Sequence, residues 1–333
     1  MGQEMKVLVT GGTGFVGRHL IRVLIQKGAS VRILVRKSRN TDEFRNCAVE
    51  FVHGDVTNRD SLNGIAKDTD IVFHLAAMGH VSAVTEAAYK TFFDINVRGT
   101  QNLVEECCRR KVKKFIHFSS TAAMGLINQP LVDETVLCQP TTPYQRSKFE
   151  SEKIIAYKFK ELGFPGLVLR PCMIYGPGGT GEFLKFCWLI KKGFFPKIGR
   201  GKNLTPMVHV NDVVQASILT AKKGKSGETY LIASSRSFEM DEIRSLIAKH
   251  LGVNIPYIYV PYLFASIGAY ILETAAKLFN FIPVVTSKNI KSTVIDRTFS
   301  IEKATKELGY IPETDLGHGI EETIAWYRAG GFL

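Results

Sequence analysis

Tyr144 and Lys148 lie four residues apart in the segment Pro-Tyr-Gln-Arg-Ser-Lys. Thr141 or Thr142 can cap a helix at this point, and Pro143 suits the first turn of that helix. A spacing of four then places the phenol and the ammonium on one helix face. Because a neighbouring cation and a helix N-terminus both favour the phenolate, we expect them to lower the pKa of Tyr144 from its usual value of about 10. Such a phenol can exchange a proton with a substrate, and the alternative interpretation is an ordinary surface Tyr–Lys pair.

A second candidate site is the glycine turn near the N-terminus, where Gly11, Gly14 and Gly17 follow the spacing G-x-x-G-x-x-G. A buried strand over residues 7–9 precedes this turn, and a helix over residues 15–26 follows it. The first glycine allows a tight turn, the second lets the backbone approach a pyrophosphate at the helix N-terminus, and the third lets the helix pack closely. Strand, turn and helix in this order indicate a dinucleotide site. The turn adds three candidate cofactor contacts: Thr13, Phe15 and Val16.

Further motifs follow in chain order. They are Gly54-Asp55-Val56, His74-Leu75-Ala76-Ala77, Asn96-Val97-Arg98-Gly99-Thr100, Ser119-Ser120, Arg170-Pro171 through Tyr175-Gly176-Pro177, His209-Val210-Asn211-Asp212-Val213 and Glu307-Leu308-Gly309-Tyr310-Ile311-Pro312. Together with the glycine turn and the Tyr–Lys pair, this order resembles the extended short-chain dehydrogenase/reductase family, within the NAD-dependent epimerase/dehydratase superfamily. The resemblance covers nearly the whole chain.

This resemblance implies hydride transfer with acid–base catalysis. Tyr144 would exchange the proton with the substrate oxygen. Lys148 would lower the pKa of that tyrosine and hold the nicotinamide ribose. Ser120 would orient the reacting oxygen, and its position along the chain favours it over the neighbouring Ser119. Asn96 is either the anchor of a proton relay or a structural residue of its helix.

The end of the second strand bears on the choice of cofactor. Enzymes that use NAD place an acid there to bind the ribose 2′-hydroxyl, but this chain has Arg36 and Lys37. A guanidinium can bind a 2′-phosphate, so we predict NADP(H), with NAD as the alternative. Asp55 is expected to accept a hydrogen bond from the adenine amine, to cap a helix over residues 58–66, or both. Further cofactor contacts are expected at Val56, Leu75, Ala76, Ala77, Pro171 and Met173.

The substrate pocket is expected to include Ser120 and a largely apolar set of residues: Met78, His80, Met124, Met173, Tyr175, Phe183 and Met207. Nucleotide-sugar enzymes of this family commonly carry an arginine just before the final strand, where this chain has Leu204, Thr205 and Pro206. The pattern resembles the dihydroflavonol 4-reductase and 3β-hydroxysteroid dehydrogenase branch. We therefore predict an oxidoreductase for a hydrophobic ketone or secondary alcohol of steroid-, flavonoid- or lipid-like character. The alternatives are a nucleotide-sugar 4-epimerase with tightly bound NAD and a non-catalytic cofactor-sensing regulator.

The elements that must position these residues alternate along the chain. Apolar, strand-like runs occur at 6–10, 31–35, 49–53, 71–75, 114–118 and 166–169, with helical patterns between most of them. This alternation predicts an α/β fold, a Rossmann-type doubly wound parallel sheet with helices on both faces. The resemblance implies that a strand over 228–232 returns to this sheet. The predicted domains are a cofactor-binding domain (1–175 with 205–235) and a smaller, discontinuous substrate lobe (176–204 with 236–333).

Composition limits the partners. Lys and Arg number 43 against 31 Asp and Glu, a net charge of +12, which attracts anions in general. The basic cluster of Arg109, Arg110, Lys111, Lys113 and Lys114 lies at a predicted helix end, so we interpret it as solvated surface and expect no nucleic-acid partner. The six cysteines show neither C-x-x-C pairs nor zinc-site spacing, which predicts reduced thiols and no metal site. No signal-peptide pattern precedes the first strand, so a cytoplasmic protein is expected.

Two predictions concern surfaces. Residues 257–282 are unusually apolar but carry Glu273 and Lys277, so they do not suit a membrane-spanning helix. They form either a buried helix of the substrate lobe, or a lid or membrane-surface helix, which at most allows peripheral membrane contact. The family resemblance also implies a homodimer built from helices over 92–108 and 144–162, with Phe149, Ile154, Ile155 and Phe159 as apolar surface.

Overall fold

The computed structural model describes residues 5–79, 86–127, 129–193, 195–199, 201–255, 258–279, 281, 283, 286–292 and 294–333. Its main element is a seven-stranded sheet in the order β11-β6-β5-β4-β1-β2-β3, in which every pair is parallel. This order, with β11 added at one edge, is that of a Rossmann fold, so the predicted fold class is confirmed. The strands are β1 (Lys6–Thr10), β2 (Ser30–Val35), β3 (Val49–His53), β4 (Ile71–His74), β5 (Lys114–Phe118), β6 (Gly166–Pro171) and β11 (Thr229–Ile232).

The strands are apolar throughout because both faces of the sheet are covered. In β1, Val7 and Val9 belong to one hydrophobic cluster, whereas Leu8 between them belongs to a second cluster on the other face. Successive side chains of a strand point to opposite faces, so an unbroken apolar run supplies both cores at once. The strand expected at 228–232 does return to this sheet, where β11 pairs with β6.

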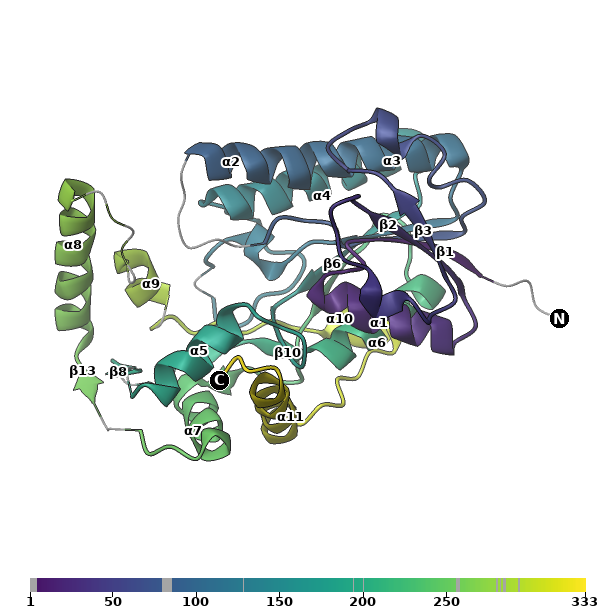
Figure 1. Cartoon of the computed structure of the whole chain (residues 1–333). Helices are drawn as coiled ribbons and strands as arrows, with labels where there is room; N and C mark the ends of the chain where they lie inside the picture. The colour runs from purple at the N-terminus through teal and green to yellow at the C-terminus, as the bar shows by residue number, and fades with distance from the viewer. Residues whose placement is uncertain are drawn as a thin grey trace.

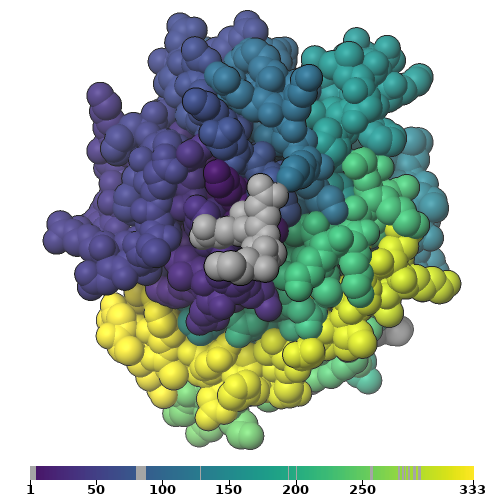
Figure 2. Space-filling view, turned by 90° about the vertical axis from the view of Figure 1, so that its right-hand side faces the viewer, coloured from purple at the N-terminus to yellow at the C-terminus, as the bar shows by residue number. Residues whose placement is uncertain are grey.

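Two layers of helices enclose the sheet (Figure 1). On one side lie α2 (Glu86–Phe92), α3 (Gly99–Arg110) and α4 (Pro143–Leu162), and on the other lie α1 (Phe15–Gln26), α6 (Val210–Lys223) and α10 (Glu302–Leu308). The helix expected over 92–108 is interrupted, because a π-helical turn, Phe93–Arg98, joins α2 to α3. Figure 2 shows the C-terminal part of the chain, in yellow, beside the purple N-terminal part.

The second half of the chain forms a smaller group of elements with its own apolar core. Helices α5 (Glu182–Lys191), α7 (Met240–Leu251) and α11 (Leu316–Ala329) contribute to one cluster of buried side chains. Three pairs of short strands accompany them: β7 (Met173–Tyr175) with β10 (Met207–His209), β9 (Leu204–Thr205) with β12 (Phe238–Glu239), and β8 (Lys197–Ile198) with β13 (Tyr259–Val260). The domain boundaries stay a prediction.

Helix α8 (Tyr262–Phe279) and the short α9 (Ser287–Ser292) stand apart from the sheet, at the left of Figure 1. The interpretation of the apolar run as a buried helix is wrong for most of its large side chains. Leu263, Phe264, Ile271 and others on α8 are exposed, whereas Ala269 and Ala276 are buried. Among the described residues no helix is both long and apolar enough to cross a membrane. Residues 257, 280 and 282 of the predicted segment lie outside the described residues.

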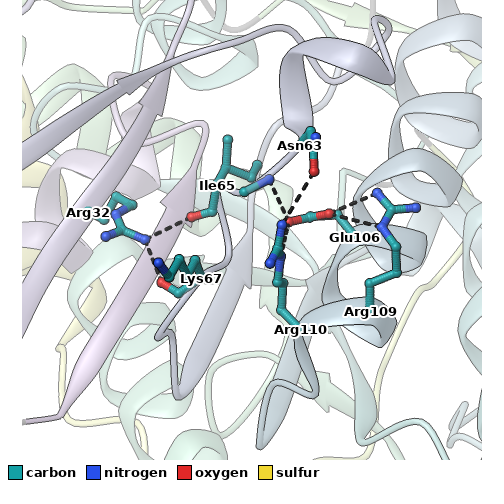
Figure 3. A network of polar contacts seen from close by, with 8 residues as sticks. Arg32, Asn63, Ile65, Lys67, Glu106, Arg109 and Arg110 are labelled. Carbon is teal, nitrogen blue, oxygen red and sulfur yellow. Dashed lines mark hydrogen bonds and ion pairs between the residues drawn. The ribbon is translucent and has the colours of Figure 1, made fainter.

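Much of the basic cluster has partners within the protein (Figure 3). Glu106 is fully buried on α3 and pairs with Arg109 at 2.8 Å and with Arg110 at 2.9 Å. Lys113 pairs with Asp70 at 2.7 Å. The ammonium of Lys114 donates to backbone carbonyls at the end of α6, as the last turn of a helix favours. These contacts give the cluster a structural function, beyond the solvated surface that we expected.

The helices expected at a dimer interface expose only part of their apolar surface. Ile155 of α4 is buried in the core and Ile154 packs against that core, so neither offers free surface. Phe159, Tyr157 and Leu162 of the same helix are exposed. The homodimer stays a prediction.

Candidate active site

The glycine turn has the geometry that its spacing predicts. Gly11 has a φ of +71°, and a Cβ there would lie 2.6 Å from the backbone nitrogen of Ala76. A Cβ on Gly17 would lie 2.3 Å from the carbonyl oxygen of Gly11, so helix α1 can approach the turn only with glycine here. Gly14 is the N-cap of α1, where no side chain caps the helix and no acidic residue occupies the first turn. The backbone N–H groups of this helix start are thus suited to a pyrophosphate.

A cleft with a volume of about 920 Å³ opens at this turn, beyond the ends of β1, β2 and β4. In a doubly wound sheet this edge, where the strand order reverses, is the place for a cofactor. The cleft is lined by ten of the predicted cofactor contacts: Gly11, Thr13, Gly14, Phe15, Arg36, Asp55, Val56, Leu75, Ala76 and Ala77. Seven further predicted contacts are not among its described lining residues: Val16, Gly17, Lys37, Tyr144, Lys148, Pro171 and Met173.

Two arginines in the turn after β2 line the cleft. Arg36 and Arg39 are both exposed and both line it, and the backbone N–H of Arg39 donates to the carbonyl of Arg36 at 2.9 Å. Sequence reasoning missed Arg39, although its position three residues after Arg36 is typical of one turn. Two guanidiniums on one turn suit a phosphate group.

Asp55 does not cap a helix. Its carboxylate accepts hydrogen bonds from the backbone N–H and the hydroxyl of Thr57, at 2.9 and 2.7 Å. The carboxamide of Asn58 accepts from the N–H groups of the next turn instead, and that turn is a short 3₁₀ helix, η2 (Asp60–Leu62). The predicted capping role was wrong because Asn58 lies closer to the helix start. The adenine contact of Asp55 stays a prediction.

Tyr144 and Ser120 come together at the carboxyl end of β5. Thr142 and Gln145 form a reciprocal capping box at the start of α4, with Pro143 in the first turn, as the sequence indicated. Tyr144 follows directly and forms a hydrogen bond with the side chain of Ser120. Ser119 is buried instead, and its hydroxyl has no partner among the described residues.

Lys148 lies one turn further along α4 and is buried. Its ammonium donates to the carbonyl oxygen of Phe118 at 2.5 Å. Burial lowers the pKa of Lys148 to about 8, against a smaller opposite effect of the Glu152 carboxylate. The predicted lowering of the Tyr144 pKa is wrong for this structure. Burial of the phenol raises the pKa of Tyr144, and the hydrogen bond with Ser120 offsets this only in part.

Replacing Lys148 by Met should stabilise the fold at neutral pH. The lowering of its pKa from 10.5 to about 8 shows that the fold disfavours the ammonium, by at most about 3 kcal/mol. This penalty is absent at a pH above the pKa of Lys148 in the unfolded chain, and it is fully present at a pH below the pKa of Lys148 in the folded protein. Lys148→Met should therefore raise the free energy of unfolding by about 2 kcal/mol near pH 7, with a smaller gain above pH 10. Urea unfolding of both proteins across this range measures it. A gain that does not change with pH would contradict the prediction.

A chain of buried side chains behind the site was missed by sequence reasoning. His74 contacts the hydroxyl of Thr10 through Nδ1 at 2.7 Å and that of Thr100 through Nε2 at 2.9 Å. Thr100 donates its own proton to the carbonyl of Asn96, so Nε2–H of His74 must donate to Thr100. Burial lowers the pKa of His74 to about 3, so Nδ1 accepts the proton of Thr10. Thr10 in turn accepts from the N–H of Ala76, and the chain fixes a wall of the cleft.

Asn96 is fully engaged in structural hydrogen bonds. Its oxygen accepts from the N–H of Met78 at 2.8 Å, and its amide donates to the Met78 carbonyl and to the hydroxyl of Ser147 on α4. Asn96 therefore ties the segment after β4 to the helix that carries Tyr144. Its position in a π-helical turn is frequent for residues at functional sites.

The predicted substrate residues divide into two groups. Met78 and Met173 are partly exposed, and Met124 is buried in the 3₁₀ turn that begins after Ser120. His80 lies outside the described residues. Tyr175, Phe183 and Met207 are buried together in the core of the smaller group of elements, with ring centroids of Tyr175 and Phe183 5.3 Å apart. Packing explains these three positions without a substrate, and their contact with one stays a prediction.

A comparison with known families agrees with this geometry. The model of the NAD dependent epimerase/dehydratase family matches residues 7–233, which include the glycine turn, Ser120, Tyr144 and Lys148. The chain belongs to this family. It is therefore an NAD(P)-dependent enzyme, and its cofactor is a nicotinamide dinucleotide.

Its relatives include reductases and dehydrogenases. Short-chain dehydrogenase/reductase family 42E member 1 of Homo sapiens is 30% identical, over 99% of this chain and 88% of that protein. A 4-hydroxy-2-methyl-3-oxo-4-farnesyl-3,4-dihydroquinoline-1-oxide ketoreductase of Stigmatella aurantiaca is 26% identical, over 95% of each chain. The 3beta-hydroxysteroid-dehydrogenase/decarboxylase isoform 1 of Arabidopsis thaliana is 27% identical, over 96% of this chain and 79% of that protein. The predicted likeness to the 3β-hydroxysteroid dehydrogenase branch is confirmed.

The solved structures that resemble this chain include an epimerase as well. The crystal structure of gox2253 has a TM-score of 0.84 at 28% identity, covering 98% of this chain and 99% of that one. UDP-glucose 4-epimerase of Thermotoga maritima, solved with UDP-glucose, has a TM-score of 0.79 at 26% identity, with the same coverage of both chains. The fold alone therefore leaves both reductase and epimerase chemistry open.

Proposed function

We propose that the protein is an NADP(H)-dependent oxidoreductase for a hydrophobic ketone or secondary alcohol. The observation that carries this proposal is the hydrogen bond between Tyr144 and Ser120, with the buried Lys148 one helical turn away. The glycine turn fits the cofactor, because a Cβ at Gly11 or Gly17 would collide with backbone atoms. When the cofactor is bound, its nicotinamide ring supplies or accepts the hydride.

The residues of the chain supply the proton chemistry. The raised pKa of Tyr144 keeps its phenol protonated at neutral pH, so its Oη can donate to a carbonyl oxygen as an alcohol forms. The Ser120 hydroxyl orients that oxygen. Lys148, with a pKa of about 8, is mostly cationic at neutral pH and stabilises the phenolate left by the transfer. In the reverse direction Tyr144 takes the proton back from the alcohol.

The proposed substrate class rests on the segment before β10. Leu204 and Thr205 form strand β9 and Pro206 follows, so the sequence positions at which nucleotide-sugar enzymes carry an arginine hold no cationic residue. The ketoreductase and the steroid dehydrogenase among the relatives have names that indicate large hydrophobic substrates, which supports the same choice.

One observation favours a nucleotide-sugar epimerase as the second candidate. Arg297 is half-buried, and its Nε is a buried atom with no hydrogen-bond partner among the described residues. Burial lowers the pKa of this arginine, which shows a guanidinium that is poorly compensated by its surroundings. An anionic group of a substrate would compensate it.

Two measurements distinguish the candidates. NADPH consumption should be seen with steroid or flavanonol ketones and not with UDP-glucose. Calorimetry with UDP should show no binding in the micromolar range, for the native protein and for Arg297→Gln alike. Interconversion of UDP-glucose and UDP-galactose, or micromolar UDP binding that Arg297→Gln removes, would replace the proposed function by the epimerase.

A further inference from the structure

Helix α8 has its small residues turned inward and its large apolar residues turned outward. Ala265, Ala269 and Ala276 follow a spacing of four and seven, and Ala269 and Ala276 are buried. The opposite face carries large side chains, with Leu263 64%, Phe264 65% and Leu278 78% exposed. A helix on the surface of a protein in water normally shows the reverse pattern. The exposed apolar face of α8 consists of Leu263, Phe264, Ile267, Tyr270, Ile271, Leu278 and Phe279.

The charges on and around α8 are arranged to match this face. The carboxylate of Glu273 accepts hydrogen bonds from the N–H and the hydroxyl of Ser287, at 3.1 and 2.8 Å, at the start of α9. The acid of α8 is therefore turned toward α9 and away from the exposed apolar face. Lys291 is exposed on α9.

Two more lysines lie near the N-terminal end of α8. Lys191 and Lys192 are exposed at the end of α5, a few residues before β8, and β8 pairs with β13, which leads into α8. Tyr259 of β13 and Tyr262 at the start of α8 are also exposed. Tyrosines beside an apolar face, bordered by lysines, are typical of a segment that lies at a membrane–water interface.

We propose that α8 docks the protein onto an anionic lipid surface, with the exposed apolar face in the boundary between headgroups and acyl chains. The helix would lie in the plane of the membrane surface, consistent with the absence of a spanning helix among the described residues. Anionic lipids complement Lys191, Lys192, Lys291 and the net charge of +12. A second copy of the chain is the less favourable occupant, because a two-fold interface would bring these lysines of two +12 chains together. This proposal is independent of the proposed substrate.

Vesicle co-sedimentation tests the proposal on the full chain. The native protein should sediment with vesicles of phosphatidylcholine and phosphatidylserine, and more weakly with phosphatidylcholine alone. The variant Phe264→Ser/Ile267→Ser/Ile271→Ser should lose at least about tenfold in binding to the mixed vesicles. Lys191→Gln/Lys192→Gln/Lys291→Gln should lose the preference for anionic vesicles.

The matched control replaces exposed leucines that lie outside α8 and α9, as Leu131→Ser/Leu137→Ser/Leu162→Ser, and should bind vesicles as the native protein does. Thermal unfolding and nicotinamide cofactor binding, followed by fluorescence, should be unchanged in all three variants. The proposal is overturned if the native protein ignores both vesicles, or if the serine variant on α8 binds them normally. It is also overturned if the native protein is a dimer that ignores vesicles and the α8 variant is a monomer, because a second copy then covers the helix.

Discussion

Tyr144→Phe should reduce kcat by about a thousandfold or more while cofactor affinity changes little. The substitution removes the hydroxyl that we propose exchanges a proton with the substrate oxygen, and it keeps the ring that packs against Phe92, with centroids 5.7 Å apart. Steady-state rates and cofactor titration by fluorescence measure the two effects separately. Tyr157→Phe is the matched control, because Tyr157 is an exposed tyrosine of the same helix and should show native rates.

Two further readouts identify the role of Tyr144. Below the Lys148 pKa of about 8, the rate of ketone reduction should not change with pH, because the raised pKa of Tyr144 keeps the phenol protonated, and the rate of alcohol oxidation should rise with pH. Ser120→Ala should reduce the rate less than Tyr144→Phe does. It should lose about 3 kcal/mol of transition-state stabilisation, because it removes one orienting hydrogen bond. A Tyr144→Phe variant with near-native kcat would show that another group transfers the proton.

The sheet and the glycine turn were predictable because their signals are local. An apolar run such as 6–10 must be buried on both faces, and glycine at 11 and 17 is the residue that a tight, closely packed turn requires. The pairing of Thr142 with Gln145 at the start of α4 is equally local, since both residues lie within one helical turn. For such features the sequence spacing nearly defines the geometry.

The remaining features depend on contacts between distant parts of the chain. His74 lies 64 residues from Thr10 and 26 residues from Thr100, so the sequence around His74 does not predict its hydrogen-bond partners. Hydropathy shows that residues 262–279 are apolar. It does not show that the large side chains of α8 point outward. For Tyr144, spacing predicts a neighbouring cation, whereas the sign of the pKa change is decided by burial.

Arg36→Ala should weaken NADPH binding by about tenfold to a hundredfold and NADH binding by less than about twofold. Only NADP(H) carries the 2′-phosphate, and a charge-assisted hydrogen bond to a phosphate contributes about 1.5–3 kcal/mol. Arg36 follows β2 directly and lines the cleft beside Asp55 and the glycine turn, so we expect it at the adenosine end of a cofactor bound there. Fluorescence titration of both cofactors against both proteins gives the four affinities.

Two related variants separate a specific contact from general attraction. Arg45→Ala removes an exposed cation that pairs with Asp42 outside the cleft, and it should leave both affinities unchanged. Arg39→Ala should reduce NADPH affinity as well, because Arg39 lines the same cleft on the same turn. If native NADH binding equals or exceeds NADPH binding, the preference for NADP(H) is wrong. In that case Arg36 and Arg39 contribute only positive charge to the surface, and another residue of the cleft must bind the ribose 2′-hydroxyl of NAD.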